Sequence, residues 1–407
     1  MAVDRKWVVL VGDGMGDYPQ ELLNGQTPLE GARTPNMDRM AAQGTVGWAQ
    51  TVPPTCEPGS DIANLSILGY DPVIYHTGRA PLEAVSLGIS LREEDVAFRC
   101  NLVCLDDRPE GAVVMHSYSA GHISTEEARE IIRDLQGAFN HPDLQFYPGV
   151  SYRHILVWKG ADPSLKTLPP HDLTGQDVCP YLLSEGALKP VMDLMARSRS
   201  FLSHHPINRE RRKQGLLPAN SIWLWGQGKT PAMPSFKERF GLRGGVISAV
   251  DLLKGIGLAA GLESLSVEGI TGYLDTNYRG KVEKALDFLS SHDLVFVHVE
   301  APDETSHEGS LEKKIQAIEA FDREMVGPLW EGLKRFPAYS LLVITDHYTP
   351  VAIMTHTREP VPLVVYCSGD SNRPVRKRGF SEQTALEGEV AFPKGDRIMS
   401  WFLATKE

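Results

Sequence analysis

The sequence predicts an α/β fold in which a parallel-rich sheet is flanked by helices and an α+β domain is inserted. Apolar runs of strand length recur near both ends of the chain, and helical patterns separate them. The middle of the chain has shorter and more polar strand patterns. Apolar strands that alternate with helices are typical of a parallel sheet covered on both faces. We therefore expect a core domain formed by residues 1–75 and 240–407, interrupted by an inserted domain at residues 76–239.

The first part of the core begins with a buried strand and continues with two short helices. Residues 6–14 (KWVVLVGDG) form an apolar run that ends in glycines and Asp13. Residues 34–44 (TPNMDRMAAQG) predict a helix with Thr34 as its cap. Residues 61–70 (DIANLSILGY) predict the next helix, directly after the breaker run PPTCEPGS.

The inserted segment and the C-terminal part of the core have different strand patterns. The inserted segment alternates polar strand patterns such as SYRHILVWKG with helical patterns such as STEEAREIIRDLQGAF. Residues 244–261 then predict a strand followed by a helix. Residues 293–304, 339–347 and 361–369 contain continuous apolar strands. We expect these strands to join the strand at residues 6–14 in one parallel sheet.

Composition and charge exclude several classes of protein. The 407 residues carry a formal net charge of -11, and broad nucleic-acid binding needs a basic face instead. No stretch approaches the ~20 apolar residues that a membrane span needs, and the first apolar run is too short for a signal peptide. The five cysteines are scattered, which fits a reduced cytoplasmic setting better than a disulfide scaffold.

Three of the apolar strands end in aspartate. The run WVVLVGD ends at Asp13, LVFVHVEAPD ends at Asp303 after a short turn, and LLVITD ends at Asp346. In open parallel sheets, ligands bind beyond the carboxyl ends of the strands. We therefore expect the three carboxylates to converge on one edge of the sheet.

Histidines accompany two of these aspartates at spacings that suit metal coordination. Asp303 and His307 are four residues apart, so they share a face if that turn is helical. His347 follows Asp346 directly, and His356 comes nine residues later. Together with Asp13, these groups are enough for two cations with open positions. Carboxylate and imidazole ligands without thiolate suit Mn²⁺ or Zn²⁺, with Mg²⁺ or Co²⁺ as alternatives.

Ser60 lies at the predicted start of a helix, after Gly59. Unpaired N–H groups and the helix dipole favour a phosphate there. A serine at this place is most often a plain N-cap. Beside a metal cluster, however, coordination lowers the pKa of a hydroxyl and makes it an attacking oxygen. The sequence therefore predicts a two-metal phosphoryl-transfer centre with Ser60 as its nucleophile.

A set of longer motifs resembles one known family. The segments VGDGMGD, EPGSDIANLSILGYDP, GRAPLEAVSLGI, SAGHIS, GVSYRH, GGVISAVDLLKGIG, EAPDETSH and TDHYTPV follow one another along nearly the whole chain. In this they resemble the archaeal-type, cofactor-independent phosphoglycerate mutases of the alkaline phosphatase superfamily. One departure is Tyr348, where many members of that family have proline.

The resemblance implies an alkaline-phosphatase-like core with an inserted substrate-binding domain. It implies that Ser60 accepts the phosphoryl group of 3-phosphoglycerate and returns it to the 2-oxygen of the trapped glycerate, with no bisphosphoglycerate cofactor. The implied ligands of one metal are Asp13, Ser60, Asp346 and His347. Those of the other are Asp303, His307 and His356.

The substrate-binding groups follow from the same resemblance. They would be His122, Arg153 and His154 in the insert and Lys254 in the core, although each fits a surface charge or a stabilising pair equally well. Arg79 and Arg99 are weaker candidates. The motifs leave open a homoserine kinase-like phosphotransferase of the same family and a metal-dependent phosphatase. They do not indicate the oligomeric state, and the partner we expect is a small phosphorylated substrate.

Overall fold

The computed structural model describes residues 5–369 and 374–405, which divide into two compact units. The first unit contains Met1–His76 and Ala232–Glu407, and the second contains Thr77–Pro231. Residues 232–239, which the expected boundary assigned to the insert, belong to the first unit, where the Tyr70 hydroxyl donates to the Pro234 carbonyl at 3.0 Å. Within the described ranges, no helix is long and apolar enough to cross a bilayer.

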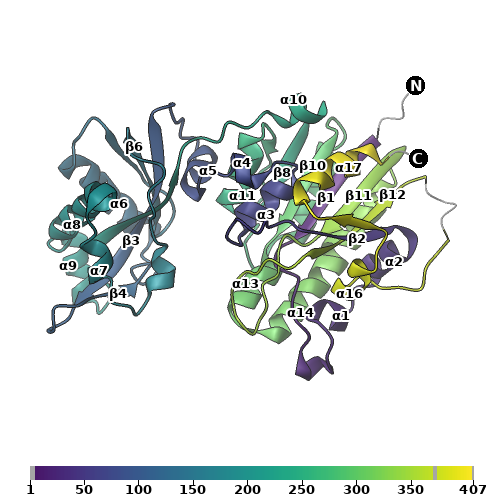
Figure 1. Ribbon diagram of the computed structural model, residues 1–407, viewed down its shortest axis with the longest axis horizontal. Coiled ribbons are helices and arrows are strands. Elements are labelled where there is room, and N and C mark those ends of the chain that lie inside the picture. The colour runs from purple at the N-terminus through teal and green to yellow at the C-terminus, as the bar shows by residue number, and fades with distance from the viewer. Residues whose placement is uncertain (1–4, 370–373, 406–407) are drawn as a thin grey trace. The chain divides into compact units, whose positions relative to one another are not determined.

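The first unit is built on an eight-stranded sheet with the order β13-β2-β12-β11-β1-β10-β8-β9 (Figure 1). Its strands are β1 (Arg5–Gly12), β2 (Thr45–Ala49), β8 (Gly244–Ile247), β9 (Glu263–Ser264), β10 (Leu294–Val299), β11 (Ala338–Ile344), β12 (Val361–Cys367) and β13 (Val390–Phe392). Strand β1 pairs in parallel with both β10 and β11, so the three strands end at the same edge.

The sheet is parallel-rich, as the sequence predicts, but one strand runs the other way. Strand β12 is antiparallel to both β11 and β2. The expectation that residues 361–369 join this sheet as a parallel strand was therefore wrong, whereas the expected parallel-rich sheet is confirmed. An apolar run shows that a strand is buried, but it carries no information about the direction of that strand.

Helices of the first unit pack around this sheet. They are α1 (Pro28–Gly31), α2 (Pro35–Gln43), α3 (Ser60–Ile67), α4 (Pro72–Tyr75), α10 (Phe236–Phe240), α11 (Asp251–Ala259), α12 (Tyr278–Phe288), α13 (Ala301–His307), α14 (Leu311–Ala320), α15 (Gly327–Leu333), α16 (Glu382–Leu386) and α17 (Ile398–Ala404). The Thr34 side chain does not cap α2. The Asp322 carboxylate, from the π-helical turn between α14 and α15, instead accepts the N–H groups of Asn36 and Met37.

The second unit has its own antiparallel sheet and its own core. The strands follow the order β4-β3-β6-β5, and β7 also pairs with β3. They are β3 (Asp95–Asp107), β4 (Val113–Ser117), β5 (Leu144–Tyr147), β6 (Arg153–Lys159) and β7 (Ser221–Gly228). The helices are α5 (Arg79–Ser86), α6 (Thr125–Ala138), α7 (Cys179–Leu182), α8 (Lys189–Leu202) and α9 (Pro206–Lys213). Apolar residues of the sheet and of the helices form one cluster, which includes Trp223 and Phe98.

Candidate metal centre and nucleophile

Three neighbouring strands bring three aspartates together at one edge of the sheet. Asp13 directly follows β1, Asp346 follows β11, and Asp303 lies in the first turn of α13, just after β10. All three are buried, with exposed fractions of 2%, 0% and 7%. The parallel pairing of β1 with both neighbours explains the convergence, because the carboxyl ends of these strands meet at one place.

Two overlapping sets of side chains have the spacing of metal-binding groups. One set is Asp13, Asp346 and His347, and the other is Asp303, His347 and His356, with the ligand atoms of each set within 4.8 Å of one another. His307 adjoins the second set, because its Nε2 lies 3.2 Å from Asp303 Oδ2. The structure thus brings together all the aspartates and histidines that the sequence predicts for the centre, with His347 between the two sets.

The Asp346 carboxylate is held by the backbone and by one amide side chain. Its Oδ1 accepts the N–H groups of Gly14 at 3.0 Å and of His347 at 2.9 Å. Its Oδ2 accepts a hydrogen bond from Asn64 Nδ2 at 2.9 Å. These bonds tie the end of β1 and helix α3 to the end of β11, so the carboxylate has one fixed orientation.

The two other carboxylates have opposite pKa shifts. Burial raises the pKa of Asp13, and the charges of Asp346 and Asp303 raise it further. Burial alone would also raise the pKa of Asp303, but hydrogen bonds from His307 and His356 hold it well below its usual range. Like charges packed this closely favour protonation of one carboxylate, and a bound cation would remove that repulsion.

The histidine rings are oriented by the atoms behind them. His307 Nδ1 lies 2.9 Å from the Met354 carbonyl, so this nitrogen donates to that oxygen and the ring has a fixed orientation. His307 Nε2 and His356 Nε2 face each other at 3.0 Å. Burial lowers the pKa of His307, but the Asp303 carboxylate outweighs this effect and raises the pKa to about 9. Burial lowers the pKa of His347 to about 4, so that ring is neutral at pH 7.

The residues of this centre fit divalent cations. Asp13 Oδ1 is buried and has no hydrogen-bond partner within the described part of the chain. Such an orphaned carboxylate oxygen beside converging imidazole nitrogens is the arrangement that a cation would complete. The nitrogen and oxygen donors, with no cysteine in either set, suit hard or borderline divalent ions.

Ser60 is the first residue of α3 and points at this centre. Gly59, not Ser60, occupies the N-cap position, so the helix has no side-chain cap. Ser60 Oγ lies 3.1 Å from His347 Nε2. The plain N-cap interpretation of Ser60 is therefore wrong, and its hydroxyl is available at a helix N-terminus beside the metal-binding groups.

One residue of the centre was missed by the sequence interpretation. His298 lies in β10 with 0% of its surface exposed, and its Nε2 is 3.1 Å from Asp13 Oδ2. Burial lowers its pKa to about 4, so the ring is neutral. A polar residue inside the continuous apolar run LVFVHV was the signal that could have found it.

Tyr348 lies against the segment that follows Asp13. Its ring occupies the space beside Gly16, where an added Cβ atom would be 2.3 Å from Tyr348 Cδ1. The Tyr348 ring is 8% exposed, and burial is the largest cause that raises its pKa far above the usual range. The ring therefore packs as a neutral side chain and leaves the neighbouring His347 in place.

In the second unit, His122 and Arg153 flank the Tyr152 ring. The ring centroids of His122 and Tyr152 are 6.0 Å apart, and the Arg153 guanidinium carbon lies 5.3 Å from the Tyr152 ring centroid. His122 has a φ of 52° and Ser151 a φ of 53°, in the left-handed region that non-glycine residues seldom adopt. Ser151 Oγ donates to the Ile123 carbonyl at 2.7 Å, which joins the two turns. We call His122, Tyr152 and Arg153 the aromatic turn.

The other predicted substrate-binding residues lie in different surroundings. His154 follows Arg153 in β6 and so points to the opposite face of the strand, where it is 2% exposed and its Nδ1 accepts the Gly149 N–H at 3.0 Å. Lys254 in α11 is half-buried, with Nζ 3.1 Å from Asp251 Oδ1. Arg99 lies 3.1 Å from Glu83. Substrate roles for these residues stay predictions.

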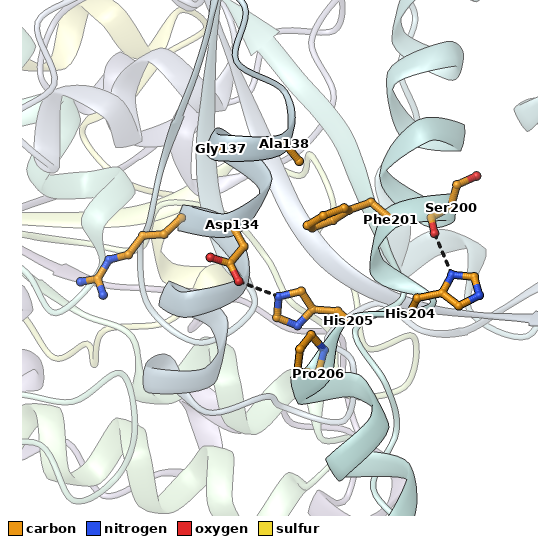
Figure 2. Close-up of a pocket in the computed structure, with 9 residues that line it drawn as sticks. Asp134, Gly137, Ala138, Ser200, Phe201, His204, His205 and Pro206 are labelled. Carbon is orange, nitrogen blue, oxygen red and sulfur yellow. Dashed lines mark hydrogen bonds and ion pairs between the residues drawn. The ribbon is translucent and has the colours of Figure 1, made fainter.

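A cavity of about 600 Å³ in the second unit lies apart from the predicted residues (Figure 2). It is lined by Arg133, Asp134, Gly137, Ala138, Ser200, Phe201, His204, His205 and Pro206. The His205 ring spans the gap to α6, with Nε2 3.0 Å from Asp134 Oδ2. This contact satisfies the buried imidazole, and none of the residues predicted for the site lines the cavity.

Comparison with known proteins assigns the chain to a family. The profile of "2,3-bisphosphoglycerate-independent phosphoglycerate mutase" matches residues 41–208. A Geobacter sulfurreducens protein named "Probable 2,3-bisphosphoglycerate-independent phosphoglycerate mutase" is 50% identical over 398 residues, which cover 98% of this chain and 99% of that protein. The Methanosarcina barkeri protein of the same name, without "probable", is 47% identical over 98% of this chain and 100% of its own.

Two solved structures share the fold over the full length. A Pyrococcus horikoshii protein has a TM-score of 0.82 at 29% identity, covering 100% of this chain and 99% of that one. The cofactor-independent phosphoglycerate mutase of Thermoplasma acidophilum has a TM-score of 0.64 at 29% identity, covering 98% and 99%. The agreement in motifs, length and fold shows that this chain belongs to the 2,3-bisphosphoglycerate-independent phosphoglycerate mutase family.

Proposed function

We propose that the protein is a cofactor-independent phosphoglycerate mutase, an isomerase that interconverts 3-phosphoglycerate and 2-phosphoglycerate through a phosphoserine at Ser60. The observation that carries the proposal is the position of Ser60 Oγ, 3.1 Å from His347 Nε2 and at the N-terminus of α3. This position puts a nucleophile where backbone N–H groups and the helix dipole stabilise a phosphate.

The reaction consists of two phosphoryl transfers that share one intermediate. Ser60 Oγ forms a bond to phosphorus while the bond from phosphorus to the C3 oxygen breaks, and that oxygen takes up the proton that Ser60 releases. The glycerate then reorients. Its C2 oxygen forms the new bond to phosphorus, the bond to Ser60 breaks, and Ser60 Oγ regains a proton from the C2 hydroxyl. No bisphosphoglycerate is needed, because the phosphate never leaves the protein.

The metal-binding groups divide into two sets in this proposal. Asp13, Ser60, Asp346 and His347 would hold one divalent cation, and Asp303, His307 and His356 would hold the other. We expect Mn²⁺, with Zn²⁺, Mg²⁺ or Co²⁺ as alternatives. When bound, such cations lower the pKa of a hydroxyl and offset the negative charge of a phosphoryl group. Two of these ligands are held by other groups of the chain. Asn64 and the Gly14 N–H hold the Asp346 carboxylate, and the Met354 carbonyl holds the His307 ring.

Substrate recognition is the role that we propose for the second unit. Arg153 and His122 offer a guanidinium and an imidazole on the aromatic turn, which suits the carboxylate of glycerate. Lys254 of the first unit is the proposed partner of a phosphate, because its ammonium is half-buried and held by a single carboxylate. We also propose that the reaction takes place in the cytoplasm, because the five scattered cysteines fit a reduced setting.

An assay with two substrate mixtures tests the proposal. Metal-free protein is loaded with Mn²⁺ and given either 3-phosphoglycerate alone or homoserine with ATP. We expect 2-phosphoglycerate from the first mixture, without added bisphosphoglycerate, and phosphorylated Ser60 in a quenched sample analysed by mass spectrometry. Phosphorylation of homoserine without mutase turnover would favour the kinase alternative. Release of inorganic phosphate as the main product would favour a phosphatase.

A further inference from the structure

The three aspartates of the metal centre are not held equally well. Asp346 accepts hydrogen bonds on both of its oxygens. Asp303 has the Thr349 hydroxyl on Oδ1 and His307 Nε2 at 3.2 Å from Oδ2. Asp13 differs, because its Oδ1 has no hydrogen-bond partner among the residues described. The donor beside its other oxygen is His298, with Nε2 at 3.1 Å from Oδ2.

His298 has no other task for its ring. The side chain is 0% exposed, and neither ring nitrogen makes an aligned hydrogen bond within the described part of the chain. The neighbouring positions of β10 are valine and phenylalanine, so packing alone would be served by an apolar residue. A buried ring nitrogen without a partner is costly, which indicates that this imidazole is retained for a contact that forms at the centre.

The backbone of His298 is held by a buried lysine and by strand pairing. Lys281, which is itself 0% exposed, donates from Nζ to the His298 carbonyl at 2.9 Å. Strand β1 pairs with β10 on both sides of this position, with Val11 opposite His298 and Gly12 opposite Val299. His298 and Asp13 therefore project from two paired strands, and a turn of the carboxylate about its soft terminal torsion is enough to align the bond.

We infer that His298 is a positioning residue for Asp13, whose Oδ2 accepts the His298 Nε2–H so that Oδ1 is left to bind the cation. This inference rests on the proposed function only in that the centre binds a divalent cation. Groups that orient a metal ligand in this way typically change metal affinity by about 10–100-fold. The other ring nitrogen near this carboxylate in the described chain, His347 Nε2, lies 3.4 Å from Oδ1 and not beside Oδ2.

The test measures Mn²⁺ affinity of the metal-free full chain by isothermal titration calorimetry. His298→Gln places an amide N–H near the position of Nε2, His298→Asn places it near Nδ1, and His298→Leu removes the donor. We expect His298→Gln to bind Mn²⁺ within about threefold of the wild type, and the other two variants to bind about 10–100-fold more weakly. Thermal unfolding of each metal-free variant is measured in parallel.

A matched control separates positioning from packing. Phe296 lies on the same strand and the same face, two residues earlier, and is also 0% exposed. Phe296→Leu is expected to lower the unfolding temperature of the metal-free protein and to leave Mn²⁺ affinity unchanged. A purely structural histidine would behave like Phe296, with altered stability in all three variants and no rank order in metal affinity.

The outcomes that overturn the inference are distinct from those that overturn the mutase proposal. Equal Mn²⁺ affinity of the glutamine and asparagine variants would overturn it, and so would wild-type affinity of His298→Leu. If the leucine variant does not fold, the polar pair still decides the question. A wild-type protein that binds Mn²⁺ but converts no 3-phosphoglycerate would refute the proposed reaction and leave the His298 comparison readable.

Discussion

The metal centre of the first unit and the aromatic turn of the second unit are built in opposite ways. The centre uses buried side chains at the ends of paired strands, with exposed fractions of 0–7% for its three aspartates. The aromatic turn uses exposed His122, which has left-handed backbone, and exposed Arg153, which begins β6 two residues after the left-handed Ser151. Chemistry that needs fixed charges has the rigid sheet as its support. The two exposed groups proposed to recognise substrate lie in a turn and at the first residue of a strand, where substitution of one residue disturbs little of the core.

The backbone beside the aromatic turn contains a run of left-handed residues, whereas the metal centre has one left-handed non-glycine residue, Met354, among the residues that contact its ligands. Ala120, Gly121 and His122 have consecutive φ values of 47°, 66° and 52°. Left-handed residues that are not glycine cost about 1–2 kcal/mol each, and such strain collects at functional sites. The Arg211 guanidinium donates to the Ala120 carbonyl at 2.9 Å and helps to hold this conformation. The run at Ala120, Gly121 and His122 therefore carries a local conformational cost in the second unit.

Removing the nucleophile is the change with the largest expected effect on this comparison. Ser60→Ala should lower mutase turnover by about 10⁴-fold or more, because no other hydroxyl replaces the attacking oxygen. Turnover is measured with an assay coupled to consumption of 2-phosphoglycerate. Ser66→Ala is the matched control on the same helix, since Ser66 Oγ donates to the Thr51 carbonyl at 2.6 Å and not to a ligand of the centre. Full activity in Ser60→Ala would refute a phosphoserine at this position.

The pH dependence of the free energy of unfolding tests whether burial raises the pKa of Glu382 in the first unit. Burial raises the pKa of Glu382 to about 7, while Thr27 and the Asp17 N–H hold its carboxylate oxygens. The folded state therefore binds the proton more tightly than the unfolded state. The contribution of Glu382 to the free energy of unfolding is fully present below the ordinary pKa of glutamate. It is lost as the pH rises toward 7, and the total loss is ~3 kcal/mol.

Glu382→Gln isolates this contribution, because glutamine does not titrate. Free energies of unfolding in urea are compared for the wild type and the variant between pH 4.5 and 8. We expect the wild type to lose stability relative to the variant across that interval. Parallel curves for the two proteins would show that Glu382 keeps its ordinary pKa, and that this part of the first unit admits solvent.

A smaller effect is expected when the aromatic turn loses its cation. Arg153→Ala should raise the KM for 3-phosphoglycerate by about tenfold to thirtyfold, the usual effect of losing a hydrogen bond to a charged group. Mn²⁺ affinity should not change. Arg129→Ala, which removes an exposed arginine from α6, serves as the control and should leave KM unaltered. A drop in Mn²⁺ affinity without a change in KM would show that Arg153 supports the metal centre and does not bind substrate.

The smallest expected effect concerns the strained backbone itself. Gly121 has a φ of 66°, so Gly121→Ala should destabilise the protein by ~1 kcal/mol even though an added Cβ comes no closer than 3.4 Å to Leu217. Gly137 in α6 has open space around it, and Gly137→Ala should stabilise by ~0.5–1 kcal/mol. Thermal unfolding of both variants checks these opposite signs. Stabilisation by both substitutions would show that Gly121 carries no backbone strain.

Sequence patterns predicted the centre better than its surroundings. The carboxyl ends of parallel strands must meet at one edge, so Asp13, Asp303 and Asp346 were predictable from three apolar runs that end in aspartate. His298 was missed because an apolar run does not show which face of a strand meets its neighbours. The left-handed turn at His122 was not predictable, since only glycine signals such backbone reliably.

Strand alternation was a signal that the prediction did not use. Arg153 and His154 are adjacent in one strand, so they cannot project to the same face. The direction of β12 lay beyond any pattern in the sequence, because the same apolar run serves a parallel or an antiparallel neighbour. Direction is set by the connections between strands, which the chain reveals only when it is folded.

The place of β1 in the sheet has a consequence for synthesis on the ribosome. Strand β1 emerges first, yet its two neighbours, β10 and β11, begin at Leu294 and Ala338. The second unit, whose strands pair only with one another in the described sheet, is complete by Pro231. The insert can therefore fold while the N-terminal segment is still unpaired and apolar. This arrangement predicts that the nascent N-terminal segment is the part of the chain that most needs a chaperone.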